Sequence, residues 1–265
     1  MNKRILILCE AIAPPAYSPR IITLVEWLQA HGWHCEIATE MDDDTAWEST
    51  VCKIHQMPTY RRLVADKVLG AKEKAFVKYI QQHIDVNSFD LIFCGSYYYF
   101  PLQAAKRLAE IYRLPLVVDL RDITEQWGKL DYYTRRFTGI QCIDRIAKGI
   151  YTYINTQKRN HVLRGATAVT TVSPWHQRTL AQYNPNTHLI YNGYDAHTFY
   201  PKTLVIESFD ITFIGKYYSH YQDCPRLLFA ALQSLIATNQ IAVDEVKVHF
   251  YTNAVGQADF AKLAK

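Results

Sequence analysis

The stretch that decides the fold of this chain is VVDLRD, residues 117–122. It begins as an apolar run, which is typical of a strand buried on both faces of a sheet. It then ends in charged side chains, and open parallel sheets bind ligands beyond the carboxyl ends of their strands. The stretch IYNGYD, residues 190–195, has the same form. Together they predict a parallel sheet with a ligand site at its rim.

Strand and helix patterns alternate on both sides of this stretch. Strand patterns lie at residues 5–9, 35–39, 51–57, 91–94, 116–119, 168–172 and 188–191. Helical patterns lie between several of them, at residues 18–32, 64–79, 101–112 and roughly 138–163. Such alternation is typical of a parallel sheet with helices on both faces. We therefore predict an α/β, Rossmann-like, doubly wound domain over residues 1–195.

The pattern changes after residue 195. Residues 196–208 have the composition of a linker, and residues 209–265 begin a second strand–helix–strand unit. Its strands are expected at 211–214 and 246–251, with a helix at 225–237 between them. Because domains usually need on the order of 100 residues, we expect this second Rossmann-like domain to be incomplete in the chain.

Composition narrows the class of protein. The chain has 265 residues, 49% of them hydrophobic and 20% charged, which is ordinary for a soluble globular protein. A net charge of +4 implies no broad surface for nucleic acid. The six cysteines have no metal-ligand spacing, and no apolar run is long enough to span a bilayer. A cytoplasmic location is the simplest expectation.

The positive charge is concentrated in residues 129–164, which contain eight Lys or Arg against two Asp. This segment also holds several tyrosines, so it could contact anionic lipid head groups or a phosphate-bearing substrate. A solvated helix face is the more common explanation of such a run of charge, and a peripheral contact at the inner membrane face is the alternative. In that alternative the cations that face lipid are Arg135, Arg136, Lys158 and Arg159.

The first turn, residues 11–20, contains no glycine. A dinucleotide fingerprint needs glycines there so that the backbone can approach a pyrophosphate, so a dehydrogenase is disfavoured. Arg20 near a helix N-terminus can still attract an anion, although a capped helix with a surface arginine is an equal alternative. The run Asp42-Asp43-Asp44 is more typical of a solvated loop than of a metal site, and we expect no metal.

Charged residues at the mouth of the 116–119 strand suit a ligand. Asp119, Arg121 and Asp122 could hold sugar hydroxyls or a phosphate, or could form an ion pair that only fixes the loop. Ser96 ends the preceding strand and is followed by aromatic residues that could line an acceptor cleft. Ser173 could contact a ligand or cap the helix that Pro174 begins.

Two glycine-containing turns could approach a phosphate. Asn192-Gly193 could bring the backbone close to a phosphate or sugar, or could be a simple turn. Gly215-Lys216 opens the first turn of the second domain, where a lysine could reach a donor phosphate.

The order of these motifs resembles the amino-terminal half of the retaining GT-B glycosyltransferases of family 4. The resemblance rests on DLRD at 119–122, on ATAVTTVS at 166–173, on the element N-G-x-D-x-x-x-F-x-P at 192–201, and on FIGK at 213–216. The proline-rich loop at 14–20 is similar but lacks the family's glycines. The third of these elements is the most specific.

The resemblance implies two Rossmann-like domains facing across a cleft, the first for a glycan or lipid-linked acceptor and the second for a nucleotide-sugar donor. It implies transfer with retention and without a metal or cofactor, the donor being a substrate. On this basis the catalytic residues are Arg121 and Asp122. Acceptor-binding residues are Arg20, Ser96, Asp119 and Ser173, and donor-binding residues are Asn192, Gly193, Gly215 and Lys216.

Two departures from the family pattern limit the expected activity. Many relatives have a histidine where Arg121 stands, and the family's paired glutamates belong to a later part of the second domain than this chain contains. The chain alone is therefore expected to transfer little or no sugar. Two alternatives remain: a nucleotide-sugar 2-epimerase, and a non-catalytic Rossmann-like binding or scaffold module.

Overall fold

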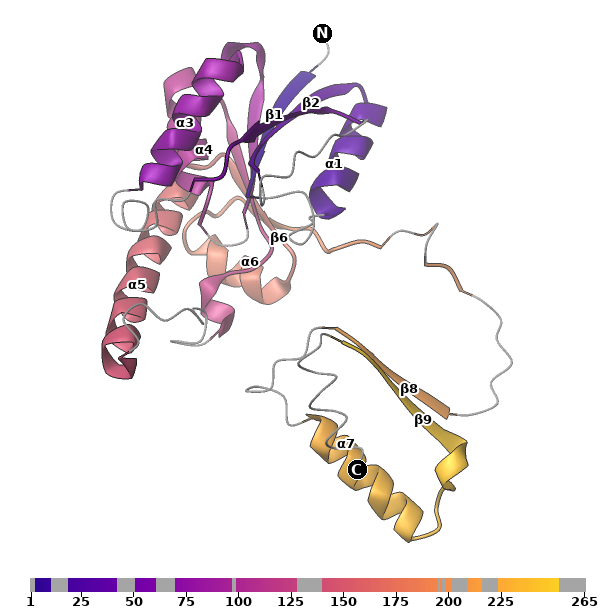
Figure 1. The fold of residues 1–265 in the computed structure, drawn as a ribbon. Coiled ribbons are helices and arrows are strands. Elements are labelled where there is room, and N and C mark those ends of the chain that lie inside the picture. The colour runs from indigo at the N-terminus through magenta and orange to yellow at the C-terminus, as the bar shows by residue number, and fades with distance from the viewer. Residues whose placement is uncertain are drawn as a thin grey trace. The chain divides into compact units, whose positions relative to one another are not determined.

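A computed structural model of the chain divides into two compact units, residues 1–194 and 195–265 (Figure 1). The structure describes residues 3–10, 19–41, 51–60, 70–96, 99–127, 140–194, 196, 199–201, 209–215 and 224–252.

The first unit is built on a sheet of seven parallel strands in the order β3-β2-β1-β4-β5-β6-β7. The strands are β1 (Lys3–Cys9), β2 (Trp33–Glu40), β3 (Lys53–Met57), β4 (Leu91–Ser96), β5 (Leu116–Leu120), β6 (Ala168–Thr171) and β7 (Thr187–Leu189). The helices between them are α1 (Pro19–Ala30), α3 (Ala71–His83), α4 (Leu102–Tyr112), α5 (Gln141–Gly165) and α6 (Pro174–Ala181). The α/β prediction of a doubly wound parallel sheet is confirmed.

Helices cover both faces of this sheet (Figure 1). Successive side chains of a strand point to opposite faces, so β1 contributes to two apolar clusters. Leu6 and Leu8 pack in the cluster that includes residues of α3 and α4. Ile7 and Cys9 pack in the cluster that contains α1. The continuous apolar run of β1 therefore reflects burial on both sides.

The strand order reverses between β1 and β4. From β1 the chain builds outward through β2 and β3, and from β4 it builds in the other direction. Cys9 and Gly95 are register partners at the carboxyl ends of these two strands. Open α/β sheets bind ligands in the crevice beside such a switch point. Glu10 and Ser96 are the next residues along the two strands.

Within its described residues, the second unit contains two parallel strands and one long helix. Strands β8 (Phe209–Ile214) and β9 (Val246–Tyr251) pair in register from Phe209↔Val246 onward, with α7 (Cys224–Ala237) between them in sequence. Phe229 of α7 lies 6.0 Å, ring to ring, from Phe250 of β9. The predicted strands and helix of residues 209–251 are present.

The structure differs from the sequence prediction at one helix. The helix expected at 64–79 is α3, which begins at Ala71; Val64 and Val68 lie outside the described residues. Helix α6 begins at Pro174, as the capping alternative for Ser173 predicts. Among the described residues, no helix is long and apolar enough to cross a membrane.

Candidate functional site

Arg20 joins three segments at the carboxyl edge of the sheet. It lies in the first turn of α1, and its guanidinium binds Asp119 of β5 with two contacts, Nε–Oδ2 at 3.0 Å and Nη2–Oδ1 at 3.1 Å. Its Nη1 also donates to the carbonyl of Tyr191 and to Oδ1 of Asn192, both at 3.3 Å. One side chain thus fixes the segment after β7 against β5.

Asp119 lies inside the sheet, with 2% of its surface exposed. Thr170, its register partner on β6, donates from Oγ1 to Asp119 Oδ1 at 2.6 Å. Both carboxylate oxygens therefore have donors, as a buried ionised carboxylate requires. These contacts of Asp119 fit an ion pair that fixes the edge of the sheet better than they fit direct binding of an acceptor.

Asp122 is oriented by a short hydrogen-bond chain. Its Oδ1 accepts from Nε2 of Gln126 at 2.8 Å, and Oε1 of Gln126 lies 2.8 Å from Nε2 of His176 on α6. Because the Gln126 nitrogen serves Asp122, its oxygen must accept, which places the imidazole proton on Nε2. These hydrogen bonds hold the partly exposed carboxylate of Asp122 in place, next to Arg121 at the mouth of β5.

His176 belongs to this arrangement although the sequence did not indicate it. It is 7% exposed, and within the described part of the chain its Nδ1 has no hydrogen-bond partner. Burial lowers the pKa of His176, and the charges of Asp122 and Glu125 oppose that shift only in part. A neutral imidazole fits the tautomer that Gln126 requires.

The hydroxyls of the two predicted serines are engaged locally. Ser96 donates from Oγ to the carbonyl of Phe100 at 2.9 Å. Ser173 accepts from the backbone N–H of His176 at 3.1 Å and is the N-cap of α6, with Pro174 at the first helical position. Ser173 therefore caps α6 and positions His176, in agreement with the capping alternative for Ser173.

The four residues predicted to contact donor are divided between the two units. Asn192 is exposed and bonded to Arg20, and Gly193 beside it is exposed. Gly215 follows β8 in the second unit and donates its N–H to the carbonyl of Tyr251 at 3.1 Å. Lys216 lies outside the described residues, as does the run Asp42–Asp44.

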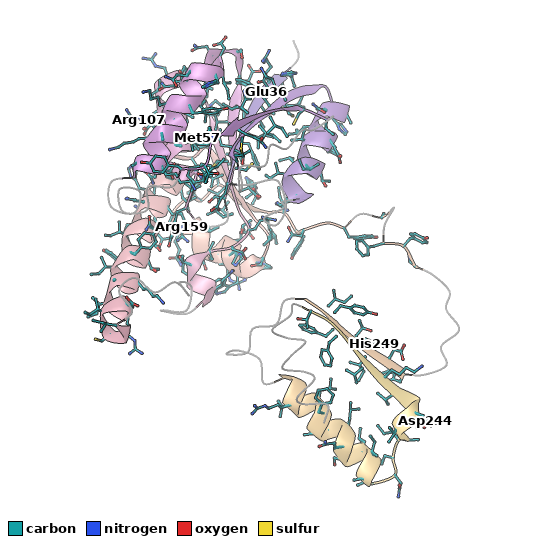
Figure 2. All side chains as sticks on the ribbon, viewed as in Figure 1. Glu36, Met57, Arg107, Arg159, Asp244 and His249 are labelled. Carbon is teal, nitrogen blue, oxygen red and sulfur yellow. The ribbon has the colours of Figure 1, made fainter. Side chains whose placement is uncertain are left out.

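An ion pair between a buried arginine of α5 and a partly exposed glutamate supports the same region. Arg159, only 2% exposed, binds Glu125 through Nη1–Oε2 at 2.8 Å and Nη2–Oε1 at 2.6 Å (Figure 2). Burial would raise the pKa of Glu125, but the hydrogen bonds and charge of Arg159 outweigh it and hold that pKa below its usual value. The expectation that Arg159 faces lipid is wrong, because its guanidinium is enclosed.

A doubly wound parallel sheet in this strand order, with charged groups at its carboxyl edge, is typical of α/β proteins that bind a ligand there. A family model described as Glycosyltransferase Family 4 matches residues 19–198, which is more than half of the chain. The chain therefore belongs to Glycosyltransferase Family 4. A search of curated protein sequences found no significant match.

Solved structures of GT-B glycosyltransferases share the fold. HepE from Anabaena in complex with UDP is 17% identical with a TM-score of 0.60, over 98% of this chain and 64% of that one. A trehalose-6-phosphate structure from E. coli bound with UDP-2-fluoro glucose is 9% identical with a TM-score of 0.58, over 99% of this chain and 68% of that one. The lipopolysaccharide outer core galactosyltransferase WaaB in its apo form is 12% identical with a TM-score of 0.53, over 98% and 71%. The chain thus spans less than two thirds of the HepE chain.

Proposed function

We propose that this chain belongs to a retaining glycosyltransferase that transfers a sugar from a nucleotide-sugar donor to a glycan or lipid-linked acceptor. The observation that carries the proposal is the family match over residues 19–198, which includes Arg20, the DLRD stretch and Asn192. The UDP bound to HepE supports a nucleotide-sugar donor. The first unit would bind acceptor, and the second would contribute to the donor site.

In this proposal Arg121 and Asp122 act at the mouth of β5. Asp122 is held in place by Gln126 and positions the acceptor, while the Arg121 guanidinium stabilises phosphate charge that develops as the donor bond breaks. Arg20 acts indirectly, because it holds Asn192 and Asp119. Gly193, Gly215 and Lys216 remain proposed donor contacts, and the reaction needs no metal or cofactor.

Nucleotide release tests this function. The purified natural protein is incubated with UDP-glucose and other nucleotide sugars, with glycan acceptors, and released nucleotide is measured. Arg121→Ala is expected to lower turnover by about 100-fold because it removes a group that stabilises transition-state charge. Asp122→Ala is expected to lower it by a similar factor because the acceptor is no longer positioned. Arg178→Ala, at an exposed position on α6, is the control and should leave turnover unchanged. A correctly folded protein that releases no nucleotide from any donor would instead favour the non-catalytic binding module.

We also propose that α5 contacts the membrane surface. Five large apolar side chains on this helix are exposed: Ile143, Ile146, Ile150, Tyr153 and Ile154. Arg145, on the same helix, is also exposed. A helix with an exposed apolar stripe and basic residues is typical of a segment that lies in the membrane interface. Tyr132, Tyr133, Arg135 and Arg136 lie outside the described residues.

Vesicle sedimentation tests this contact. The protein should sediment with vesicles of phosphatidylglycerol and phosphatidylcholine, and Ile146→Asp/Ile150→Asp should weaken that binding by about 10-fold or more, because charges replace the buried apolar contact. Ile111→Asp/Leu227→Asp changes two other exposed helical residues and serves as the control. Equal sedimentation of the two double variants would contradict a membrane role for α5.

A further inference from the structure

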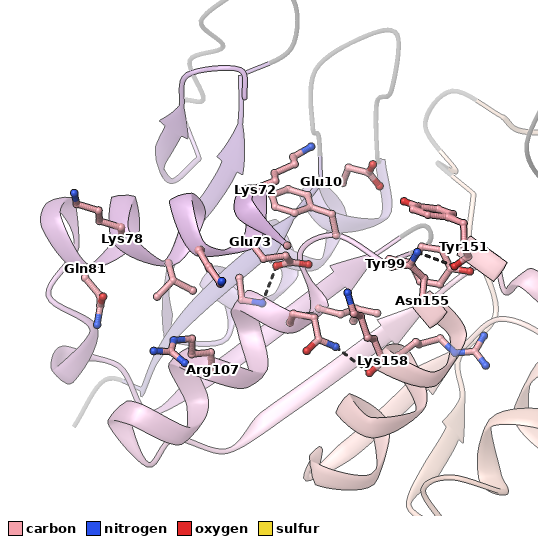
Figure 3. Close-up of a pocket in the computed structure, with 18 residues that line it drawn as sticks. Glu10, Lys72, Glu73, Lys78, Gln81, Tyr99, Arg107, Tyr151, Asn155 and Lys158 are labelled. Carbon is pink, nitrogen blue, oxygen red and sulfur yellow. Dashed lines mark hydrogen bonds between the residues drawn. The ribbon is translucent and has the colours of Figure 1, made fainter. Parts of the chain in front are cut away.

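A groove of about 650 Å³ opens where α3, α4 and α5 meet (Figure 3). This volume falls in the range of about 300–1,000 Å³ that is typical of small-molecule sites. One end reaches Glu10, beyond β1 at the switch point of the sheet, and the groove extends to Lys78 and Arg107. Arg20, Asp119 and Asn192 do not line it, whereas Arg159, which binds Glu125, does.

The groove carries a surplus of positive charge, since six Lys or Arg line it against two Glu. Two of the cations are already paired: Lys72 binds Glu40 at 2.5 Å and Arg159 binds Glu125. The other four, within the part of the chain that the structure describes, make no ion pair: Lys74, Lys78, Arg107 and Lys158. These unpaired cations therefore favour an anionic ligand in the groove.

In the protein without ligand, these cations repel one another and lower the stability of the fold. Lys74 and Lys78 are four residues apart on α3, a spacing at which like charges repel by roughly 0.2–0.5 kcal/mol. Arg107 adds a third cation from the neighbouring α4, and both lysines and Arg107 are exposed. Glu73, whose Oε2 accepts the backbone N–H of Ala104 at 2.8 Å in the first turn of α4, offsets one of these three positive charges at most. A bound anion would relieve the repulsion.

The part of the groove away from Lys78 and Arg107 suits the uncharged part of a sugar. Tyr99 and Tyr151 present ring surfaces there, in an edge-to-face contact with centroids 6.5 Å apart. Asn155 donates from Nδ2 to the carbonyl of Tyr151 and Gln103 from Nε2 to that of Lys158, both at 2.9 Å. Among the described residues their amide oxygens accept no hydrogen bond, so they are acceptors held in fixed orientations. Aromatic surface with a few oriented polar groups is typical of a ligand site.

Glu10 determines the direction in which a ligand can lie along the groove. Its Oε2 is buried at the inner end of the groove and has no hydrogen-bond partner among the described residues. A carboxylate oxygen needs a donor, and a carboxylate does not tolerate a second anion beside it. A sugar hydroxyl satisfies both conditions, so the anionic groups of the ligand belong at the far end, near Lys78 and Arg107.

We propose that this groove binds an anionic oligosaccharide, a sugar chain that carries carboxylate or phosphate groups. Its charged groups lie on Lys78 and Arg107, and a hydroxyl at its inner end donates to Glu10 at the carboxyl edge of the sheet. This inference rests on the proposed function, because it specifies the acceptor of that glycosyltransferase as an acidic glycan.

Calorimetric titration of the whole protein tests the groove without relying on turnover. The probes are tetragalacturonate, its fully methyl-esterified neutral form, and glucose 6-phosphate. Lys78→Glu/Arg107→Glu is compared with Arg178→Glu/Lys247→Glu, which makes the same charge change at two exposed positions outside the groove. The groove variant should bind tetragalacturonate at least about 10-fold more weakly, since charge-assisted hydrogen bonds are lost, whereas the control should match the unmodified protein.

The neutral ester should bind much more weakly than tetragalacturonate, and glucose 6-phosphate binding that also falls in the groove variant would identify phosphate as an accepted anion. Mass spectrometry of lysine acetylation should show Lys74 and Lys78 protected by tetragalacturonate. The inference is overturned if both double variants bind alike, if the ester binds equally well, or if the groove variant loses only binding to anionic vesicles. Sugar transfer to a neutral acceptor without groove binding would remove this inference alone, whereas groove binding without any nucleotide release would remove the proposed function alone.

Discussion

Arg20→Met is expected to lower the free energy of unfolding by about 3–5 kcal/mol, the usual cost of breaking a buried ion pair by removing one partner. Asp119 would remain in the sheet with a side chain only 3% exposed. Thr170 alone would then donate to it. The segment at Tyr191 and Asn192 would also lose its contact with α1.

Urea denaturation followed by tryptophan fluorescence measures this effect. All five tryptophans lie in residues 1–194, so the signal reports the first unit. Arg178→Met removes an exposed arginine and should change stability by less than about 0.5 kcal/mol. Adding Asp119→Asn to Arg20→Met should recover part of the loss, because the unpaired charge is then gone. A loss below about 1 kcal/mol for Arg20→Met would show that the pair does not support the fold.

The sheet was predictable because its signals are local. The central strands, such as β1 and β4, are marked by apolar runs that follow from their burial, and the family motifs lie at strand ends. The position of Asp119 was less predictable. The sequence placed it at the mouth of its strand, but β5 continues to Leu120 and Asp119 is buried. A partner 99 residues earlier makes that burial possible, and no local pattern shows it.

The contacts that orient Asp122 and the charge on α5 were harder to foresee. Gln126 and His176 are 50 residues apart and meet only through the tertiary fold. The basic segment 129–164 looked like one surface, yet α5 has distinct faces: Arg159 is enclosed beside Val162 and Leu163 of the core, while Ile150 is exposed. Figure 1 shows the N-terminal part of α5 extending beyond the sheet, so its apolar residues lack the cover that their helical spacing predicts.

Glu10→Gln is expected to stabilise the protein at pH 8 by up to about 3 kcal/mol and to change its stability little near pH 4. Burial raises the pKa of Glu10 from 4.5 to about 7, an effect that Lys72 opposes and Glu40 adds to. Below pH 4.5 the carboxyl is protonated in both the folded and unfolded states. As the pH rises towards 7, the unfolded chain ionises first, so folding loses stability through this interval. Glutamine has the same shape and no charge to bury, so it avoids this loss.

Urea titrations of Glu10→Gln at pH 4, 6 and 8 measure this dependence against the unmodified protein. The difference in unfolding free energy should be close to zero at pH 4, intermediate at pH 6 and largest at pH 8. Glu26→Gln alters an exposed glutamate on α1 and should change stability by less than about 0.5 kcal/mol at each pH. A gain from Glu10→Gln that is the same at every pH would contradict the assignment, because it would come from packing rather than from ionisation. A gain confined to high pH would show that ionised Glu10 is destabilising in the folded protein without ligand. A sugar hydroxyl in the groove would supply the hydrogen-bond donor that this carboxylate needs.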